Sequence, residues 1–283
     1  MALNVAVVTG SNKGIGLAIL KGLCNKFDGV VYMTSRSLEQ GEKAAAELRK
    51  ELSPDAGKKL KCHQLDITDA ATLTKLHDHL KSTYGGLDLL INNAGIAYLD
   101  DFMKDGTPDA TKAETTIRTN YTGTKTASEI LFPLLRKGAR VVNVCSGLGS
   151  LKGYSPEMVN RLKSEKNTPK EFDAIAQEFI GACKDGSFKA KGYVGSGYCV
   201  SKALEIGLTF WQQREFLKNR PDDQIQVHPC CPGYVATDLN ARSGPRTVEQ
   251  GAEVMLHLSF MPYQKEKLFR FWADNKDHDW ETY

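Results

Sequence analysis

Tyr198 and Lys202 are the residues whose types and spacing could do chemistry. If the stretch is helical, residues four apart lie on the same face, one turn from each other. A phenol has an ordinary pKa of about 10, so alone it is a poor acid or base near neutrality. A fixed ammonium beside it favours the phenolate and lowers that pKa. The pair could then give a proton to a carbonyl oxygen or take one back from an alcohol. The alternative is that both side chains lie on a solvated helix face.

A glycine-rich turn near the N-terminus could hold a dinucleotide. The apolar, β-branched run at residues 5–9 predicts a buried strand, and apolar residues at helical spacing follow the turn. Gly10 permits the tight turn, Gly14 lets the backbone approach a pyrophosphate, and Gly16 lets the helix pack close to the strand. The pyrophosphate would sit on the helix N-terminus. A plain strand-to-helix turn is the alternative.

Two cations favour NADP(H) over NAD(H). The second predicted strand, at residues 30–34, ends in Ser35-Arg36, and no acidic residue stands at its end. An acid there would accept a hydrogen bond from the ribose 2′-hydroxyl, whereas an arginine accommodates a 2′-phosphate. Lys13 in the glycine turn supplies a second positive charge. NADPH is therefore the predicted cofactor, unless Arg36 is merely a solvated loop residue.

Further polar or small residues follow other predicted strands. Asp66 follows the strand at 60–65, where a carboxylate could meet the adenine end of a cofactor or could cap the next helix. The stretch 92–95 could let a ligand approach the backbone, or could be an ordinary asparagine turn. Ser146 follows the strand at 140–145, where a lone serine is also common. Ligands of open α/β sheets bind outside the carboxyl ends of the strands.

Strands alternate with helices along the chain, which predicts one domain over residues 1–283: an α/β fold with a single doubly wound parallel sheet and helices on both faces. The helix at 111–135 is predicted to be one long helix interrupted by Gly123, and it contains Asn120. The remaining predicted strands lie at 87–91, 225–229 and 269–273, and the remaining helices at 39–52, around Leu73 to Leu80, at 197–218 and at 248–258.

Residues 151–193 separate Ser146 from the helix that carries Tyr198. Ser155 is expected to cap one helix with Pro156 at its first position, and residues 168–171 form the capping box of another. An apolar stripe follows and must pack on something; it consists of Phe172, Ile175, Ala176, Phe179, Ile180 and Cys183. The segment is interpreted as a helical insertion within the domain, neither a linker nor a second domain.

Composition narrows the function class. A net charge of +3 without a compact basic run does not indicate nucleic acid, and no apolar run is long enough to span a bilayer. Seven cysteines without regular spacing are typical of reduced thiols in a cytoplasmic protein. The six scattered histidines indicate no metal site.

Together these pieces resemble the short-chain dehydrogenase/reductase family, and the resemblance is closer still to its monomeric carbonyl reductases. The matching motifs occur in family order over nearly the whole chain: Thr9-Gly10-x-x-x-Gly14-Ile15-Gly16, Asp66, Asn92-Asn93-Ala94-Gly95, Asn120, Ser146, Tyr198-x-x-x-Lys202 and Pro232-Gly233-x-Val235-x-Thr237. Departures from that subfamily are Cys145 where a serine is usual, Gly197 where a larger residue is common, and Tyr234 where a tryptophan is expected.

The resemblance implies hydride transfer from NADPH to the carbonyl carbon of a small-molecule ketone, aldehyde or quinone. Tyr198 would donate the proton, Ser146 would hydrogen-bond the carbonyl oxygen, and Lys202 would lower the Tyr198 pKa and hold the nicotinamide ribose. Asn120 would help hold a water that links the lysine to solvent, and Tyr234 would line the substrate. The implied cofactor contacts are Gly10, Asn12, Lys13, Gly14, Ile15, Gly16, Arg36, Asp66, Ile67, Asn93, Ala94, Gly95, Tyr198, Lys202, Pro232, Gly233, Val235 and Thr237.

Two alternatives stay open at this point. One is a reductase dedicated to one steroid, prostaglandin or secondary-metabolite ketone. The other is a non-catalytic NADP(H)-sensing protein on the same fold, because a fold does not fix function.

A monomer is expected. In the family the helices that carry Asn120 and Tyr198 commonly pair with their symmetry mates. The apolar stripe of the insertion could instead cover those faces and wall one side of the substrate cleft. The alternative is an insertion that projects outward and makes a dimer contact.

Overall fold

The computed structural model describes residues 3–98 and 108–283 of the chain. Its centre is an eight-stranded sheet in the order β3-β2-β1-β4-β5-β6-β7-β8. Neighbouring strands pair in parallel, except that β8 runs antiparallel to β7. The strands are β1 Val5–Val8, β2 Val30–Ser35, β3 Leu60–Gln64, β4 Leu87–Asn92, β5 Leu135–Val144, β6 Gln226–Cys231, β7 Phe271–Ala273 and β8 Lys276–His278. The strand order changes direction between β1 and β4, which is where doubly wound sheets bind their ligands.

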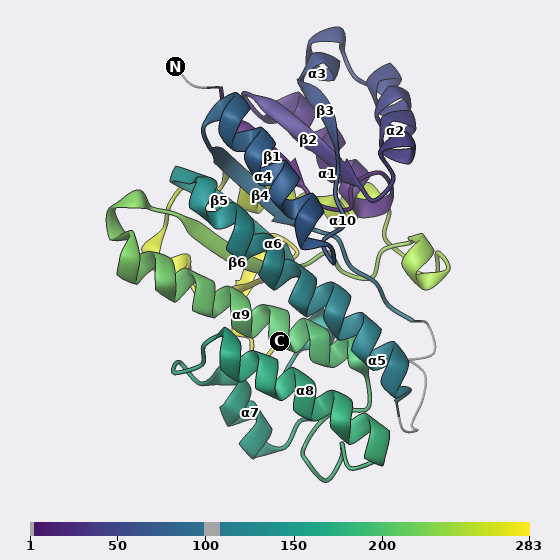
Figure 1. Ribbon diagram of the computed structural model, residues 1–283, viewed down its shortest axis with the longest axis vertical. Helices are drawn as coiled ribbons and strands as arrows, with labels where there is room; N and C mark the ends of the chain where they lie inside the picture. Colours follow the sequence, from purple (N-terminus) through teal and green to yellow (C-terminus); the bar gives the residue numbers. More distant parts are fainter. Residues whose placement is uncertain (1–2, 99–107) are drawn as a thin grey trace.

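Helices cover both faces of this sheet (Figure 1). One hydrophobic cluster joins the sheet to α1, α2 and α10, and a second joins its other face to α4 and α6. A third cluster contains the buried residues of α5, α7, α8 and α9. The helices are α1 Gly14–Lys26, α2 Leu38–Glu51, α3 Pro54–Lys59, α4 Ala70–Tyr84, α5 Ala110–Ile117, α6 Gly123–Leu131, α7 Pro156–Lys163, α8 Pro169–Asp185, α9 Gly197–Asn219 and α10 Val248–Phe260. The predicted α/β fold with its doubly wound sheet is confirmed.

The structure corrects two of the predicted elements and adds α3 and β8, which were not predicted. The helix expected at 111–135 is α5 and α6 joined by a π-helical turn, Arg118–Thr122, and α6 ends at Leu131. β5 begins at Leu135, well before the predicted residue 140, because the preceding Pro133 lies in a short 3-10 turn that ends the helix. The sheet also gains β8, which the polar sequence Lys276–His278 does not suggest.

The apolar stripe of α8 is buried, as the sequence predicts. Ser155 caps α7 with Pro156 in its first turn, and Thr168 and Glu171 form the capping box of α8. The buried side of α8 contacts α5 and α9, and Figure 1 shows α7 and α8 lying along α9.

A polar contact also fixes α8. The Tyr121 hydroxyl donates to Asp173 Oδ1 over 2.8 Å, and Lys125 Nζ lies 2.6 Å from Asp173 Oδ2. Because Tyr121 lies in the π-helical turn and Lys125 in α6, Asp173 ties the insertion to the segment that carries Asn120.

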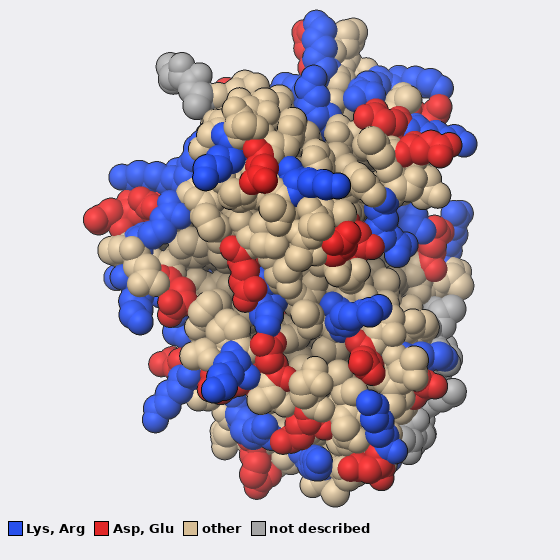
Figure 2. Space-filling view, viewed as in Figure 1, with Lys and Arg blue, Asp and Glu red and all other residues tan. Residues whose placement is uncertain are grey.

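Charged side chains of both signs are interspersed on the face shown in Figure 2, as expected for a chain with a net charge of +3. In the part of the chain that the structure describes, no helix combines the length and apolar character needed to cross a membrane.

Candidate active site

The loop between β1 and α1 has the geometry of a phosphate-binding turn. Gly10 and Gly14 both have φ of +58°, in the left-handed region that favours glycine. A Cβ on Gly16 would lie 2.7 Å from both Asn93 Nδ2 and the Ser11 Cα. Only a glycine therefore lets α1 begin this close to the end of β4, and the approach of a pyrophosphate to Gly14 stays a prediction.

The N-terminus of α1 differs from that of most other helices. It has no side-chain cap and no acidic residue in its first turn. In contrast, α2, α4, α9 and α10 each begin at a residue whose side chain accepts a hydrogen bond from a backbone N–H. Uncapped N–H groups and the positive end of the helix dipole favour an anion. The start of α1 is therefore suited to a phosphate group.

Asn93 fastens the end of β4 to the glycine turn. Its backbone N–H donates to Thr9 Oγ1 over 2.9 Å, and its amide donates to the carbonyl oxygens of Thr9 and Gly10 over 2.9 and 3.0 Å. The N–H of Ala94 also donates to Thr9 Oγ1, over 3.0 Å. The amide of Asn93 thus fixes the glycine turn from the neighbouring loop, and a cofactor contact at Asn93 or Ala94 stays a prediction.

Arg36 and Asp66 stand where the sequence places them, at the ends of β2 and β3. Arg36 is exposed, and Ile67 beside Asp66 is buried. Asp66 Oδ1 accepts from the N–H and the hydroxyl of Thr68, over 2.9 and 2.7 Å. The cap of α4 is Asp69, so the alternative that Asp66 caps this helix is wrong.

Residues 232–237 leave the end of β6 toward the glycine turn. Gly233 has φ of +80°, and Val235 is buried. Beyond this stretch, Asp238 Oδ2 lies 3.1 Å from Lys13 Nζ, with both side chains mostly exposed. The ion pair links the two sides of the predicted cofactor site, and it places a carboxylate beside a lysine that was expected at the 2′-phosphate.

Tyr198 and Lys202 lie in the first turns of α9 and are both buried. Lys202 Nζ donates to the carbonyl oxygen of Val144 over 3.0 Å and lies 5.7 Å from the centre of the Tyr198 ring. Ser146, two residues after β5 ends at Val144, hydrogen-bonds the Tyr198 side chain. The solvated-face alternative for the Tyr198 and Lys202 pair is therefore wrong. The structure brings a phenol, an ammonium and a hydroxyl together at the carboxyl edge of the sheet.

Asn120 lies behind this group in the π-helical turn and is fully buried. Its amide oxygen accepts from the Ile96 N–H over 2.8 Å, and its amide nitrogen donates to the Ile96 carbonyl over 2.9 Å and to Ser201 Oγ over 3.0 Å. A Cβ on Gly95 would lie 3.1 Å from Asn120 Oδ1 and 3.7 Å from Lys202 Nζ. Asn120 thus joins the loop after β4 to α9 within a few ångströms of the ammonium.

The net shift of the Tyr198 pKa differs from the sequence-based expectation. Burial raises this pKa, while the Lys202 charge and the hydrogen bond from Ser146 lower it, and the net value lies above the ordinary one. The ammonium therefore acts in the predicted direction but is outweighed. A buried phenolate loses its hydration, and one neighbouring cation does not replace it when a carboxylate stands behind that cation.

The carboxylate belongs to Glu205, which sequence reasoning missed. Its Oε2 lies 2.7 Å from Lys202 Nζ, and its Oε1 accepts from the Thr124 hydroxyl over 3.2 Å. Burial alone would lower the pKa of Lys202, but the Glu205 and Tyr198 side chains raise it. Burial raises the pKa of Glu205, and the ammonium opposes that change. The signal available in the sequence is a carboxylate three residues after Lys202 in a helix that is otherwise apolar at its centre.

The departures from the family pattern have local explanations. Cys145 is buried, its N–H donates to the Cys230 carbonyl over 2.8 Å, and burial raises the pKa of its thiol well above the ordinary value. A Cβ on Gly197 would lie 2.7 Å from the Ala113 Cα, so the approach of α5 excludes a larger residue at the start of α9. Tyr234 is 55% exposed and hydrogen-bonds Ser243.

Tyr283 is a second residue near the site that the sequence does not point to. Its ring packs on Phe271 and His278, and its hydroxyl interacts with Cys231 at the end of β6. A Cβ on Gly147, the residue after Ser146, would lie 2.8 Å from this ring. The aromatic side chain therefore borders the site on the side of β6 and β7.

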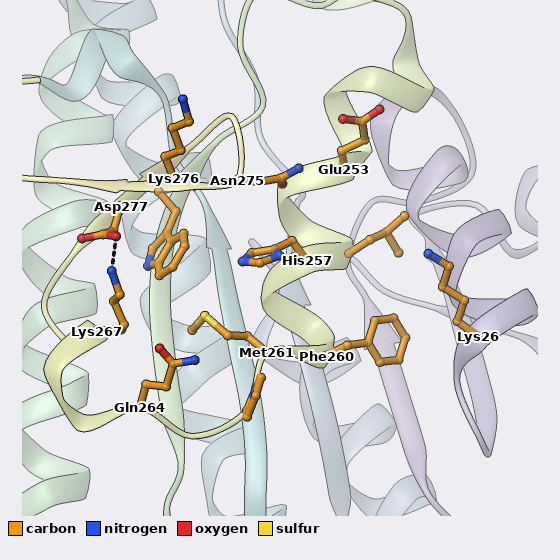
Figure 3. A pocket seen from close by; sticks show the side chains of 13 residues that line it. Lys26, Glu253, His257, Phe260, Met261, Gln264, Lys267, Asn275, Lys276 and Asp277 are labelled. Atoms are coloured by element: carbon orange, nitrogen blue, oxygen red, sulfur yellow. Dashed lines mark hydrogen bonds and ion pairs between the residues drawn. The ribbon is translucent and has the colours of Figure 1, made fainter.

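A hollow of about 740 Å³ lies elsewhere, between α10 and the β7–β8 hairpin (Figure 3). Its lining includes His257, Phe260 and Met261 from the end of α10 and the residue after it, and Lys276 from β8, and none of the predicted site residues. The size of a hollow therefore does not locate the candidate site in this molecule; the converging side chains do.

The chain matches a known family over more than half of its length. The family model for short chain dehydrogenases matches residues 4–158. The chain belongs to this family. The short chain dehydrogenase described here is also 39% identical over 280 residues to carbonyl reductase 1, an NADPH carbonyl reductase of Oryctolagus cuniculus, with 98% of each chain covered.

Two solved structures resemble this short chain dehydrogenase over nearly its whole length. Salutaridine reductase from Papaver somniferum has a TM-score of 0.83 at 30% identity, covering 95% of this chain and 99% of its own. Menthone neomenthol reductase from Mentha piperita has a TM-score of 0.79 at 30% identity, covering 96% and 98%.

Replacing Gly16 by alanine tests the close approach at the glycine turn. The added Cβ would meet Asn93, Ser11 and the Gly10 carbonyl oxygen within 2.8 Å, so we expect a loss of about 1–3 kcal/mol of unfolding free energy. Gly181→Ala in α8 is the matched control, because its Cβ would meet nothing within 4 Å and alanine favours helix. Urea denaturation measures both. Equal stability of the two variants would contradict the close approach.

Proposed function

We propose that this short chain dehydrogenase is an NADPH-dependent carbonyl reductase that acts on small ketones, aldehydes or quinones. The observation that carries the proposal is the convergence of Ser146, Tyr198, Lys202 and Asn120 at the carboxyl edge of the sheet, beside the point where the strand order reverses. The likeness to carbonyl reductase 1 over the full chain supports it.

The residues present fit a dinucleotide with a 2′-phosphate. The uncapped start of α1 and the left-handed glycines can receive the pyrophosphate. Arg36 is exposed just after the end of β2, and Lys13 lies in the turn between β1 and α1. These two side chains can supply positive charge to a 2′-phosphate. When bound, NADPH supplies the hydride that reduces the carbonyl carbon.

Tyr198 is proposed as the proton donor. Its hydroxyl is held by Ser146, so one carbonyl oxygen can receive hydrogen bonds from both groups. As negative charge develops on that oxygen, Ser146 stabilises it and the Tyr198 proton moves to it. Lys202, fixed by the Val144 carbonyl and by Glu205, balances the charge left on the phenol oxygen.

A reductase dedicated to one ketone is the second candidate. It is favoured by the likeness to two structures that are each named for a particular compound's reduction, at TM-scores of 0.83 and 0.79. Turnover of a panel of aromatic ketones, quinones and cyclic ketones with NADPH decides between broad and dedicated activity. No turnover of any member, with NADPH bound, would instead favour a non-catalytic sensor.

We also propose that the protein is a cytoplasmic monomer. The apolar side of α8 covers α9, which carries Tyr198, and α5, which leads into the turn that carries Asn120. These are the helices that were expected to pair between subunits. Burial of apolar area stabilises by roughly 25 cal/mol per Å², so this internal contact can replace a subunit contact. The seven cysteines, all among the described residues, form no disulfide, which suits a reducing compartment.

Tyr198→Phe tests the proton donor. The ring is kept and the transferable proton is lost, so kcat should fall by about 10²–10⁴-fold while NADPH binding persists. Tyr154→Phe is the matched control, since Tyr154 is also a buried tyrosine and its hydroxyl has no hydrogen-bond partner among the described residues. Steady-state kinetics and NADPH fluorescence measure the two effects, and near-normal turnover of Tyr198→Phe would refute the role.

Arg36→Asp tests the choice of cofactor. Attraction to a 2′-phosphate becomes repulsion, and like-charge juxtaposition costs several kcal/mol, so NADPH should bind about 10²-fold more weakly or worse. NADH should be affected much less. Lys137→Asp makes the same charge change on an exposed residue near the start of β5 and should leave both affinities unchanged. A preference of the unmodified protein for NADH would contradict the assignment.

Light scattering tests the assembly. A monomer of 31.2 kDa is expected at micromolar concentration, because α8 already covers the faces of α5 and α9. A stable dimer or tetramer mass would rule this out.

A further inference from the structure

Lys202 and Glu205 stand apart from every other charged side chain in the described part of the chain. Within residues 3–98 and 108–283, they are the only buried lysine, arginine, aspartate or glutamate side chains. Their side chains are 6% and 1% exposed. Burial of an ion is costly unless it is paired, and a buried pair is often no more stable than apolar residues of similar volume. Stability alone therefore does not explain a carboxylate at position 205.

The two charges and the proposed proton donor share one face of α9. Tyr198, Lys202 and Glu205 are separated by four and then three residues, so their side chains succeed one another along the helix. The ammonium lies between the phenol and the carboxylate, 5.7 Å from the ring centre and 2.7 Å from Glu205 Oε2. The hydroxyl of Thr124, which lies on α6, donates a hydrogen bond to the other carboxylate oxygen over 3.2 Å.

We propose that Glu205 is a positioning residue of the reaction: its carboxylate fixes the Lys202 ammonium and offsets its charge, so that Tyr198 stays protonated and the site works as a reductase. The inference rests on the proposed carbonyl reductase function. It adds to that function a residue that touches neither substrate nor cofactor and acts through Lys202.

The charge balance around Tyr198 supports this role. Burial raises the Tyr198 pKa, Lys202 and Ser146 lower it, and Glu205 raises it again. Two nearby thiols, Cys145 after β5 and Cys230 in β6, are buried, and burial raises the pKa of each well above its ordinary value. Neither therefore supplies a competing negative charge at neutral pH.

The remaining neighbours leave Glu205 as the negative charge to test. Cys231 at the end of β6 is a further thiol whose charge would raise the Tyr198 pKa. Asn120 and Thr124, from the π-helical turn and α6, do not titrate. Glu205 is thus the acidic residue whose charge bears on both Lys202 and Tyr198.

The direction of the effect follows from the reaction. In reduction, hydride adds to the carbonyl carbon, the phenol O–H bond breaks, and a new O–H bond forms on the product alcohol. Activity therefore needs the protonated phenol and is lost as the pH rises through the Tyr198 pKa. Alcohol oxidation needs the phenolate and is lost as the pH falls through the same pKa. A carboxylate that opposes phenolate formation favours reduction over a wider range of pH.

Glu205→Gln removes the charge and keeps the shape, and its amide oxygen can still accept from Lys202. Glu205 Oε2 lies 2.7 Å from Lys202 Nζ, and Lys202 Nζ lies 5.7 Å from the Tyr198 ring centre. The carboxylate charge therefore acts on the phenol from less than about 10 Å, and its removal should shift the alkaline limb by on the order of one pH unit. We expect the alkaline limb of kcat/KM for carbonyl reduction to move down by that amount. Alcohol oxidation with NADP+ at neutral pH should rise about tenfold, because more phenolate is present.

Two further variants separate charge from structure. Glu205→Asp keeps the carboxylate and should return the limb toward its wild-type position. Asp173, on α8 and outside the site, forms an ion pair with Lys125 of α6. Asp173→Asn makes the same carboxylate-to-amide change there and should leave the pH profile unchanged. Thermal unfolding of each variant shows that the comparison is made on folded protein.

An unchanged alkaline limb in folded Glu205→Gln would overturn the inference, and so would a shift of equal size in Asp173→Asn. If Glu205→Gln does not fold, the unmodified protein still decides: an alkaline limb of reduction below pH 8 would show that Tyr198 is not held protonated, since a phenol ordinarily titrates near pH 10.

The failure of the proposed function would be recognised separately. If the wild type reduces no carbonyl compound, the reductase assignment fails. The Tyr198 pKa can then still be measured from phenolate absorbance, as the difference between wild type and Tyr198→Phe. A lower pKa in the Glu205→Gln background supports the charge effect without any turnover, and an unchanged pKa contradicts it.

Discussion

The burial of α9 on nearly all of its sides is the constraint on which the rest of the site depends. Its residues from the start at Gly197 to Gln213 are mostly buried whichever way they point. The helix contacts β5 and β6 on one side, α5 and the π-helical turn on another, and α7 and α8 on a third. Residues on such a helix have no freedom to turn toward solvent, so Tyr198 and Lys202 hold their directions without a ligand to order them.

Hydrophobic periodicity and local sequence motifs predicted most of the fold. Buried strands such as Val5–Val8 are continuous apolar runs, and the capping residues Ser155 and Thr168 mark where α7 and α8 begin. What they could not give is the detail that tertiary contacts decide. No local pattern in Arg118–Thr122 distinguishes a π-helical turn from an α-helix, and β8 exists only because β7 offers it an edge.

For the site, too, local motifs predicted the positions of the residues, but only the three-dimensional structure gave their electrostatic balance. Motif spacing located Ser146, Tyr198 and Lys202, because those residues must follow particular strands and helix turns. The net sign of the Tyr198 shift could not be read from spacing, since it depends on burial and on Glu205 in three dimensions. Electrostatic balance at a buried site is a small difference between large opposing effects, so naming one neighbour does not fix its sign.

The π-helical turn allows one nearly continuous helix to satisfy two different neighbours. Each residue of an α-helix advances about 100° around the axis, so the wider turn at Arg118–Thr122 shifts the faces of α5 and α6 out of phase. α5 can then contact α9 and α8, while α6 contacts α4 and β4. Deletion of a single residue between 118 and 122 would restore the ordinary α-helical phase. The side chains of α5 would then be rotated away from α8 and α9.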